Sequence, residues 1–207
     1  MYELHTFAIA ANSFKPVVVA EELGIDYEHI VYDPQQGEHK NLEQIARHPL
    51  GKVPTMTHDD KSLFESASIC RYLATVENSE LLPTDTYKRA EVEQWMDFFS
   101  KHLGRWTTVL YFEKKIKPVL GREADPVTMD EAMRFGQEQA AAVDRILGER
   151  TYLCGDTITL ADIYAYAYMR YSDDVGLSLD PYPNLKRWHD TIKARPRVAA
   201  AEAKFGD

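Results

Sequence analysis

The sequence predicts a mixed α/β domain over residues 1–78 followed by an all-α domain over residues 87–207, and two observations lead to this fold class. Strand-like and helical runs alternate through the first region in the order βαβ, then α, then ββα. Beyond the polar, proline-containing stretch 78–86, only helical periodicity recurs. An α/β half joined to an all-α half is the simplest architecture with this order of elements.

The first predicted element group is a βαβ crossover. Strand-like runs at 2–9 and 27–33 enclose a helical run at 15–24, which Gly24 closes. Pro16 falls in the expected first turn of that helix, where a missing N–H removes no hydrogen bond. Two strands joined by one helix imply a right-handed crossover and therefore parallel pairing.

A polar segment with a short predicted helix at 41–47 follows the crossover. Strands at 53–58 and 62–65 then lie close enough in sequence to form an antiparallel hairpin, and a helix is expected over 66–77. Because the hairpin can join the same sheet, we predict one mixed sheet with helices on its faces.

The second region reads as a set of amphipathic helices. We predict them at 87–117, where Gly104 marks a bend, and at 126–149, 159–174 and 183–196, before a short C-terminal helix. The resulting domain contains no strand.

One of these helices begins with a recognisable capping pattern. Thr159 is expected to cap it, Asp162 to reach back as the second half of a capping box, and Ile158 to pack on Ile163. This pattern gives Asp162 a structural role and not a catalytic one.

Charge and composition limit the class of protein. A net charge of −9 and a pI near 5.3 argue against a nucleic-acid partner, because phosphate backbones require a basic surface. Two cysteines, Cys70 and Cys154, do not make a disulfide framework and favour a reducing compartment. No apolar run has the length of a membrane span, and the first residues lack the features of a signal peptide. We expect a cytoplasmic protein without membrane contact and predict no metal site.

The Val53-Pro54 step has two interpretations. Proline is tolerated at the first residue of a strand where its N–H would face solvent. Alternatively a cis bond turns the preceding backbone outward and leaves its N–H and C=O at the edge of the sheet. An edge of that kind can pair with an extended peptide ligand.

Glu65 and Ser66 lie where the hairpin ends and the next helix begins. Ser66 could act as an ordinary N-cap. Alternatively, the free N–H groups of the helix could bind a ligand carboxylate while Glu65 receives the ammonium of the same amino-acid head group. Both interpretations stay open from these residues alone.

The segment "GEHK" at 37–40 supplies two basic side chains, His39 and Lys40, ahead of the short helix. A charged loop is commonly just solvated. Together with Lys52, however, these side chains could hold a second carboxylate at the far end of a ligand.

Together these motifs resemble the cytosolic glutathione S-transferase family, in particular phi-like and nu-like bacterial members, over essentially the whole chain. "GKVP" followed by "ESASI" resembles the cis-proline and Glu-Ser pair of the family, "GEHK" resembles the segment that binds the glycine carboxylate in plant phi-class enzymes, and "GDTITLADI" resembles the capping box of the C-terminal core helix. The resemblance implies a thioredoxin-like, glutathione-binding N-terminal domain and a helical C-terminal domain that lines a hydrophobic substrate site.

The resemblance also implies a place for each part of glutathione. Glu65 and Ser66 would hold the γ-glutamyl head group. Val53, in front of Pro54, would pair its backbone with the cysteinyl unit. Three basic residues would lie near the glycine end: His39, Lys40 and Lys52.

The group that stabilises the thiolate is the point where the sequence departs from the family. In "AIAANSFK" a phi-like register places Ala11 at the catalytic serine, whereas a nu-like register places Ala10 on a threonine and Asn12 on an asparagine. Asn12 could donate through its amide, helped by the positive end of the following helix, and Ser13 is the nearest hydroxyl. The alternative is that Asn12 and Ser13 only cap that helix.

By the same resemblance, a second-substrate pocket would lie between the two halves. Four aromatic side chains are its predicted lining: Phe14, Trp106, Tyr111 and Phe112. Core packing is the alternative for each of them, since aromatics at helical spacing are more often core than ligand-facing.

The predicted function is therefore conjugation of glutathione, as co-substrate, to a hydrophobic electrophile by a homodimeric detoxification enzyme. Two alternatives remain, a glutathione-dependent disulfide reductase or peroxidase and a non-catalytic glutathione-binding protein. Because residues 10–14 contain no cysteine, redox chemistry would have to run through bound glutathione itself. The sequence leaves the electrophile open.

Overall fold

The computed structural model describes residues 1–8 and 10–205 of the 207-residue chain. The chain forms two compact units, unit 1 with Met1–Pro83 and Ala194–Asp207, and unit 2 with Thr84–Lys193. The C-terminal segment therefore belongs with the α/β unit, whereas the predicted second domain extended to residue 207. The predicted first strand ended at residue 9, which lies outside the described residues.

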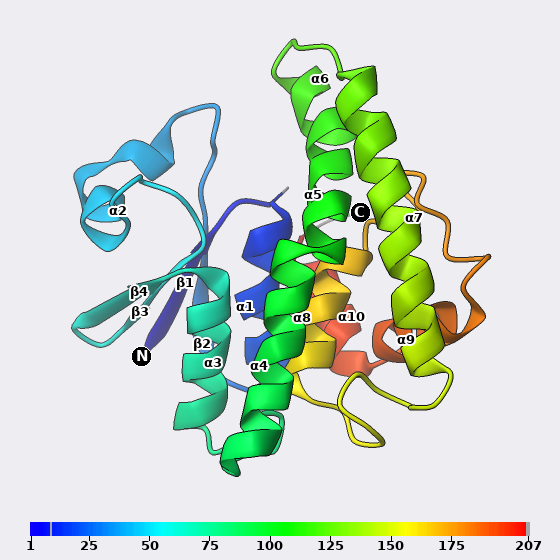
Figure 1. The fold of residues 1–207 in the computed structure, drawn as a ribbon. Coiled ribbons are helices and arrows are strands. Elements are labelled where there is room, and N and C mark those ends of the chain that lie inside the picture. The colour runs from blue at the N-terminus through cyan, green and yellow to red at the C-terminus, as the bar shows by residue number, and fades with distance from the viewer. Residues whose placement is uncertain (9, 206–207) are drawn as a thin grey trace. The chain divides into compact units, whose positions relative to one another are not determined.

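Unit 1 is built on a four-stranded sheet in the order β2-β1-β3-β4 (Figure 1). Strands β1 (Tyr2–Thr6) and β2 (Tyr27–Val31) run parallel, and β1 pairs antiparallel with β3 (Thr55–His58). β3 in turn pairs antiparallel with β4 (Lys61–Phe64). This is the predicted crossover followed by the predicted hairpin, and it is the topology of a thioredoxin-like domain.

Helices α1 (Ala11–Leu23) and α3 (Ser66–Val76) lie together beside the sheet, and α2 (Leu42–Arg47) lies on the other side of it, preceded by the short helix η1 (Glu38–Lys40) (Figure 1). The last helix, α10 (Pro196–Ala203), packs on α1. The buried apolar core of the unit includes Leu4, Phe14, Val17, Val18, Met56, Ile69 and Leu73.

Two ion pairs explain why the C-terminal segment belongs to unit 1. Arg195 donates to both carboxylate oxygens of Glu22, at 2.8 and 2.6 Å, and Lys204 lies 2.6 Å from the carboxylate of Glu21. Both acidic residues are on α1. The side chains flanking α10 thus attach it to the α/β unit.

Helix α1 begins earlier than predicted. It starts at Ala11, so Asn12 and Ser13 are helical and Pro16 lies in the helix interior instead of the first turn. Pro16 has no N–H to give to the carbonyl of Asn12, four residues before it. The N-cap is Ala10, and no side chain caps the helix, so the alternative that Asn12 and Ser13 act as caps is wrong.

Unit 2 is helical, as predicted. Its elements are α4 (Thr86–Lys101), α5 (Leu103–Tyr111), the π-helical turn η2 (Phe112–Ile116), α6 (Lys117–Val119), α7 (Pro126–Leu147), α8 (Leu160–Met169) and α9 (Pro183–Lys193).

The predicted helix 87–117 is interrupted, and the interruption is not at Gly104. The break between α4 and α5 is at His102, which has φ −121° and ψ −109°. Gly104 serves close packing, because a Cβ there would lie 2.4 Å from the carbonyl oxygen of Phe99 and 2.5 Å from the ring of Tyr168. Only glycine allows that approach.

The carboxylate of Asp162 organises the buried end of α8. It accepts hydrogen bonds from the N–H of Leu153 at 2.9 Å, from the N–H and hydroxyl of Thr159 at 2.8 and 2.9 Å, and from the indole N–H of Trp188 at 2.9 Å. The predicted reach of Asp162 back to Thr159 is confirmed. The same side chain also joins α8 to α9 and to the preceding loop.

No helix within residues 1–8 and 10–205 is both long enough and apolar enough to cross a membrane.

Replacing Asp162 by alanine is expected to destabilise the protein strongly. The substitution leaves three buried N–H groups and the Thr159 hydroxyl without an acceptor, and the three N–H groups alone cost at least about 3 kcal/mol. For a chain of this length that corresponds to a fall in Tm of roughly 6–12 °C, measurable by calorimetry. Asp130→Ala, which removes an exposed carboxylate on α7, is the matched control, and equal Tm values for the two variants would contradict the role given to Asp162.

Candidate functional site

The turn from β1 into α1 brings Asn12 to the surface. Ser13 Oγ accepts a hydrogen bond from the N–H of Phe7 at 3.0 Å and so ties the start of the helix to the end of the strand. Ser13 has no exposed surface, whereas the neighbouring Asn12 is exposed. Of the two residues predicted to act on the thiol, Asn12 is the one with an accessible side chain, and the buried hydroxyl of Ser13 anchors the turn.

Asn12 is held by a residue that sequence reasoning missed. Lys15 Nζ donates to Asn12 Oδ1 at 2.6 Å. Lys15 is completely buried, and this burial holds the pKa of its ammonium well below the ordinary value, although the nearby Cys70 and Glu65 act in the opposite direction. Its position next to the apolar run 16–20 was the available signal of a buried charge.

The Val53-Pro54 bond is cis, which decides between the two interpretations of this step. No hydrogen bond joins the N–H or C=O of Val53 to another described residue. Both groups are therefore free for β-type pairing with an extended ligand.

Buried Gln44 fixes the segment that carries this bond. Its Nε2 donates to the carbonyl of Lys52 at 2.7 Å, and its Oε1 accepts from the hydroxyl of Thr55 at 3.1 Å. Asn41 Oδ1 accepts from the backbone N–H of Gln44 at 2.7 Å and caps α2. The side chain of Lys52 remains exposed. No sequence pattern pointed to Gln44, since one glutamine in a short helix is ordinary.

The "GEHK" segment lies beside the same loop. Lys40 Nζ donates to the carbonyl of Leu50 at 3.0 Å, and a Cβ on Gly51 would lie 3.1 Å from the carbonyl oxygen of His39. The ring of His39 meets that of Phe7 edge to face, with centroids 5.0 Å apart. Burial, with Lys40 adding to it, lowers the pKa of His39, so its ring is favoured in the neutral form.

Glu65 has a strained backbone and an exposed, unpaired carboxylate. Its φ of 70° lies in the region that side-chain-bearing residues rarely adopt, at a cost of about 1–3 kcal/mol. Its side chain makes no hydrogen bond or ion pair with another described residue, yet it lies close enough to raise the pKa of Lys15. Strain of this kind is retained where a functional site requires it.

Helix α3 begins one residue earlier than the N-cap interpretation of Ser66 required. Glu65 occupies the N-cap position, Ser66 is the first helical residue, and no side chain caps the helix. The N-cap alternative for Ser66 is therefore wrong. The first-turn N–H groups stay available to an anion beside the Ser66 hydroxyl.

Phe14 does not have the exposed surface that a pocket-lining residue requires. Its ring is fully buried and packs edge to face on Phe205, with centroids 5.4 Å apart, inside unit 1. The core interpretation of Phe14 therefore replaces the predicted pocket role.

The other predicted pocket residues lie on α5 and η2. Trp106 is half-buried and stacks on Phe135 of α7 at 4.9 Å, and Tyr111 packs on Tyr171 at 4.3 Å. Phe112 is 40% exposed. Packing against neighbouring aromatic rings accounts for much of the burial of Trp106 and Tyr111, whereas Phe112 offers apolar surface to a ligand.

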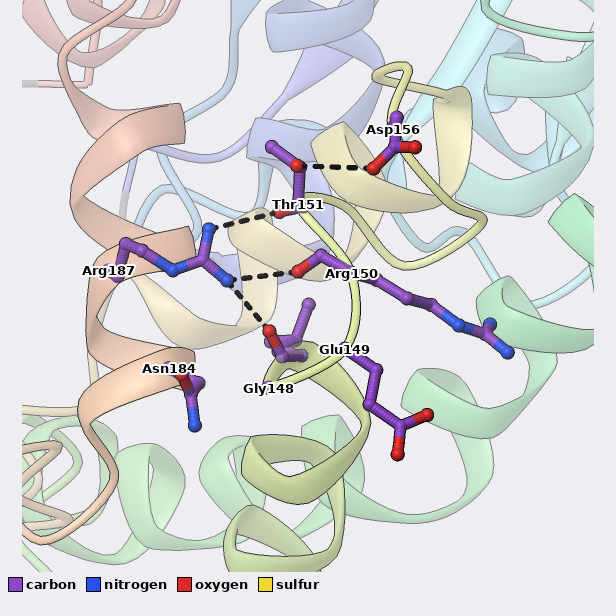
Figure 2. Close-up of a pocket in the computed structure, with 8 residues that line it drawn as sticks. Gly148, Glu149, Arg150, Thr151, Asp156, Asn184 and Arg187 are labelled. Carbon is purple, nitrogen blue, oxygen red and sulfur yellow. Dashed lines mark hydrogen bonds between the residues drawn. The ribbon is translucent and has the colours of Figure 1, made fainter.

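A cavity of about 310 Å³ lies in unit 2, where α7 ends and α9 begins (Figure 2). It is lined by Leu147, Gly148, Glu149, Arg150, Thr151, Asp156, Asn184 and Arg187. The Arg187 guanidinium donates to the carbonyl oxygens of Leu147 at 2.8 Å and of Arg150 at 3.0 Å, which satisfies the end of α7 (Figure 2). The arginine is thus structural, and none of the predicted site residues lines this cavity.

Within the described part of the chain, no group of three or more His, Cys, Asp or Glu side chains could hold a metal ion. The candidate site instead consists of the β1–α1 turn, the cis-proline segment and the start of α3. A thioredoxin-like unit with these features, followed by a helical unit, defines the class of glutathione-dependent enzymes.

Comparison with known proteins gives the family. The model described as "Glutathione S-transferase, N-terminal domain" matches residues 2–75, and "Glutathione S-transferase, C-terminal domain" matches residues 88–196. The chain belongs to the glutathione S-transferase family. The fold class, the predicted function as a glutathione transferase and glutathione as co-substrate are thereby confirmed at the level of the family.

The relatives cover nearly the whole chain. A glutathione S-transferase of Hyoscyamus muticus is 32% identical and aligns over 96% of either chain, and glutathione S-transferase 1 of Zea mays is 28% identical over 97% of this chain and 95% of its own. A glutathione S-transferase-I bound with lactoylglutathione superposes with a TM-score of 0.91 at 28% identity, covering 98% of both chains. Glutathione S-transferase I from mais in complex with an atrazine glutathione conjugate has the same TM-score and identity, over 99% of this chain and 97% of that one. These curated relatives are plant proteins, so the bacterial part of the predicted resemblance has no support from them.

The strain at Glu65 predicts an unusual order of stability among variants. Glycine adopts positive φ without a Cβ penalty, so Glu65→Gly is expected to be more stable than Glu65→Ala by about 1 kcal/mol. At ordinary positions glycine is the less stable of the two. Denaturant unfolding of both variants measures the difference, and a Glu65→Ala protein as stable as Glu65→Gly would refute the strain.

Proposed function

We propose that the protein binds glutathione in unit 1 and conjugates its thiolate to a hydrophobic electrophile. Three segments of this unit share one property that supports the proposal. Asn12, Val53 and Glu65 each present a polar group that has no partner among the described residues. A peptide ligand with its own charges and amide groups would satisfy all three.

The ends of glutathione match the charges of the site. The carboxylate of Glu65 would take the γ-glutamyl ammonium, while the Ser66 hydroxyl and the first N–H groups of α3 would take the neighbouring carboxylate. Val53 would pair its backbone with the cysteinyl unit. Lys40 and Lys52 are proposed to supply positive charge to the glycine carboxylate, and His39, with its ring in the neutral form, to donate an N–H to it.

Activation requires the thiol to ionise near neutral pH. A free thiol has a pKa of about 8.5, so only a few per cent is thiolate at pH 7. Lowering that pKa by two units takes about 2.7 kcal/mol of preferential anion stabilisation. Hydrogen bonding from the amide of Asn12 at the uncapped N-terminus of α1 is the proposed source, and Ser13 acts as the anchor of the turn.

Conjugation is favoured over redox chemistry that runs through a cysteine of the protein. Cys70 is fully buried, and burial raises the pKa of its thiol to about 12; burial likewise raises that of Cys154 to about 11. Neither cysteine has the accessible, low-pKa thiol of a redox nucleophile. The relative in complex with an atrazine glutathione conjugate supports the same choice.

Several finer features follow by analogy with the family. We propose a phi-like, cytoplasmic homodimer that acts in detoxification, with the second substrate contacting residues of α5 and η2. Its proposed apolar contacts are Trp106, Tyr111 and Phe112.

Three substrates supplied with glutathione separate the proposed function from its alternatives: an aryl halide, a hydroperoxide and a mixed disulfide. Formation of the aryl conjugate supports the transferase. Reduction of the hydroperoxide or the disulfide without conjugation would establish the redox alternative. Glutathione binding with no turnover of any of the three would establish the non-catalytic one.

Loss of the Glu65 carboxylate is expected to weaken glutathione binding. A charge-assisted hydrogen bond contributes about 1.5–3 kcal/mol, so the Kd of Glu65→Ala for glutathione should rise by at least about tenfold in isothermal titration. Glu80→Ala, which removes an exposed carboxylate of the same unit, serves as the control. An unchanged Kd in Glu65→Ala would refute the head-group assignment.

A further inference from the structure

Lys15 is an unusual residue to find inside α1. Its side chain is completely buried in an otherwise apolar helix face, where an ammonium is costly to desolvate. Buried charges are retained when they are hydrogen-bonded and serve a purpose that an apolar side chain could not. The contact that Lys15 makes with Asn12, at 2.6 Å, suggests such a purpose.

The contact fixes which end of the Asn12 amide is available. Lys15 Nζ donates to Oδ1 of the amide, and an ammonium has no lone pair that could accept from the N–H groups of Nδ2 instead. The two N–H groups on Nδ2 then point away from Lys15. No described residue accepts a hydrogen bond from Nδ2, and the side chain is exposed. The donor end of Asn12 is therefore the end presented to solvent.

Orientation matters because the two ends of an amide have opposite effects on a thiolate. Nδ2 would donate to the anion and stabilise it, whereas Oδ1 would repel it. An amide without a fixed partner can turn by half a rotation and present either end. A side chain that holds Oδ1 removes the unfavourable orientation before the substrate arrives.

We propose that Lys15 is a positioning residue that locks the amide of Asn12 with Nδ2 facing the thiol of bound glutathione. The inference rests on the proposed function, since it requires Asn12 to act on that thiol. Lys15 itself does not touch the substrate in this arrangement, and its contribution passes entirely through Asn12.

A double-mutant cycle on the full-length protein tests this path. kcat/KM for an aryl halide is measured against pH in the wild type, Lys15→Met, Asn12→Ala and the double variant, together with the KM for glutathione and the Tm of each. Lys15→Met keeps the length of the side chain and removes its donors. Lys61→Met, an exposed lysine on β4, is the matched control.

The expected results follow from the proposed path. Asn12→Ala should lower kcat/KM at pH 7 by about 10- to 100-fold and Lys15→Met by roughly 3- to 10-fold, in both cases by shifting the pH profile upward, while Lys61→Met changes nothing. The double variant should have the same kcat/KM as Asn12→Ala alone, because Lys15 has no amide left to orient once Asn12 is removed. The Tm of Lys15→Met should be equal to or above that of the wild type, since an apolar side chain replaces a buried charge.

Two results would overturn the inference while leaving the proposed function intact. One is a Lys15→Met pH profile identical to that of the active wild type. The other is a Lys15→Met effect that persists in the Asn12→Ala background, which would mean that the lysine charge acts on the thiolate directly. An inactive wild type, by contrast, is a failure of the proposed function itself. Asn12→Asp adds a further check, because it keeps the contact with Lys15 but presents an oxygen in place of Nδ2, and its loss should be at least as large as that of Asn12→Ala.

Discussion

The candidate site depends on one hydrogen bond, from the N–H of Phe7 at the end of β1 to the buried hydroxyl of Ser13 in the first turn of α1. This bond ties the first turn of the helix to the end of the strand. Asn12 consequently emerges at the surface while Ser13 and Lys15 turn inward. A helix that began later, as the position of Pro16 suggested, would have left Asn12 in a loop without a defined partner.

The rest of the site is supported in the same way, by buried polar groups behind exposed ones. Gln44 holds the residues on either side of the cis bond, through the backbone carbonyl of Lys52 and the side-chain hydroxyl of Thr55. Lys40 holds the adjoining loop through the carbonyl of Leu50. The groups left facing outward, the backbone of Val53 and the carboxylate of Glu65, are those that a γ-glutamyl tripeptide would require. Because these loops are already held in place, little binding free energy is lost in ordering them when a ligand binds.

Sequence reasoning recovered the order of the elements along the chain and the mixed sheet with its parallel crossover and antiparallel hairpin, because strand and helix periodicities were strong and the turns were well marked. It also pointed to the Val53-Pro54 bond, which is cis, whereas the role of Glu65 as a glutathione ligand stays a prediction. It failed where tertiary contacts override local preference. Pro16 suggested that the helix starts at residue 15. The helix instead begins at Ala11, and the hydroxyl of Ser13 in its first turn bonds to the N–H of Phe7. Phe14 suggested a pocket, but Phe205, distant in sequence, covers it. Lys15 and Gln44 were missed because their roles exist only through partners that the fold supplies.

Binding of glutathione and ionisation of its thiol are the two functions proposed for this protein. Ultraviolet absorbance of the thiolate, recorded for saturated wild-type protein across a pH series, tests both parts at once. We expect an apparent thiol pKa about two units below the value near 8.5 of the free thiol. Saturable binding with a pKa that stays near 8.5 would contradict it.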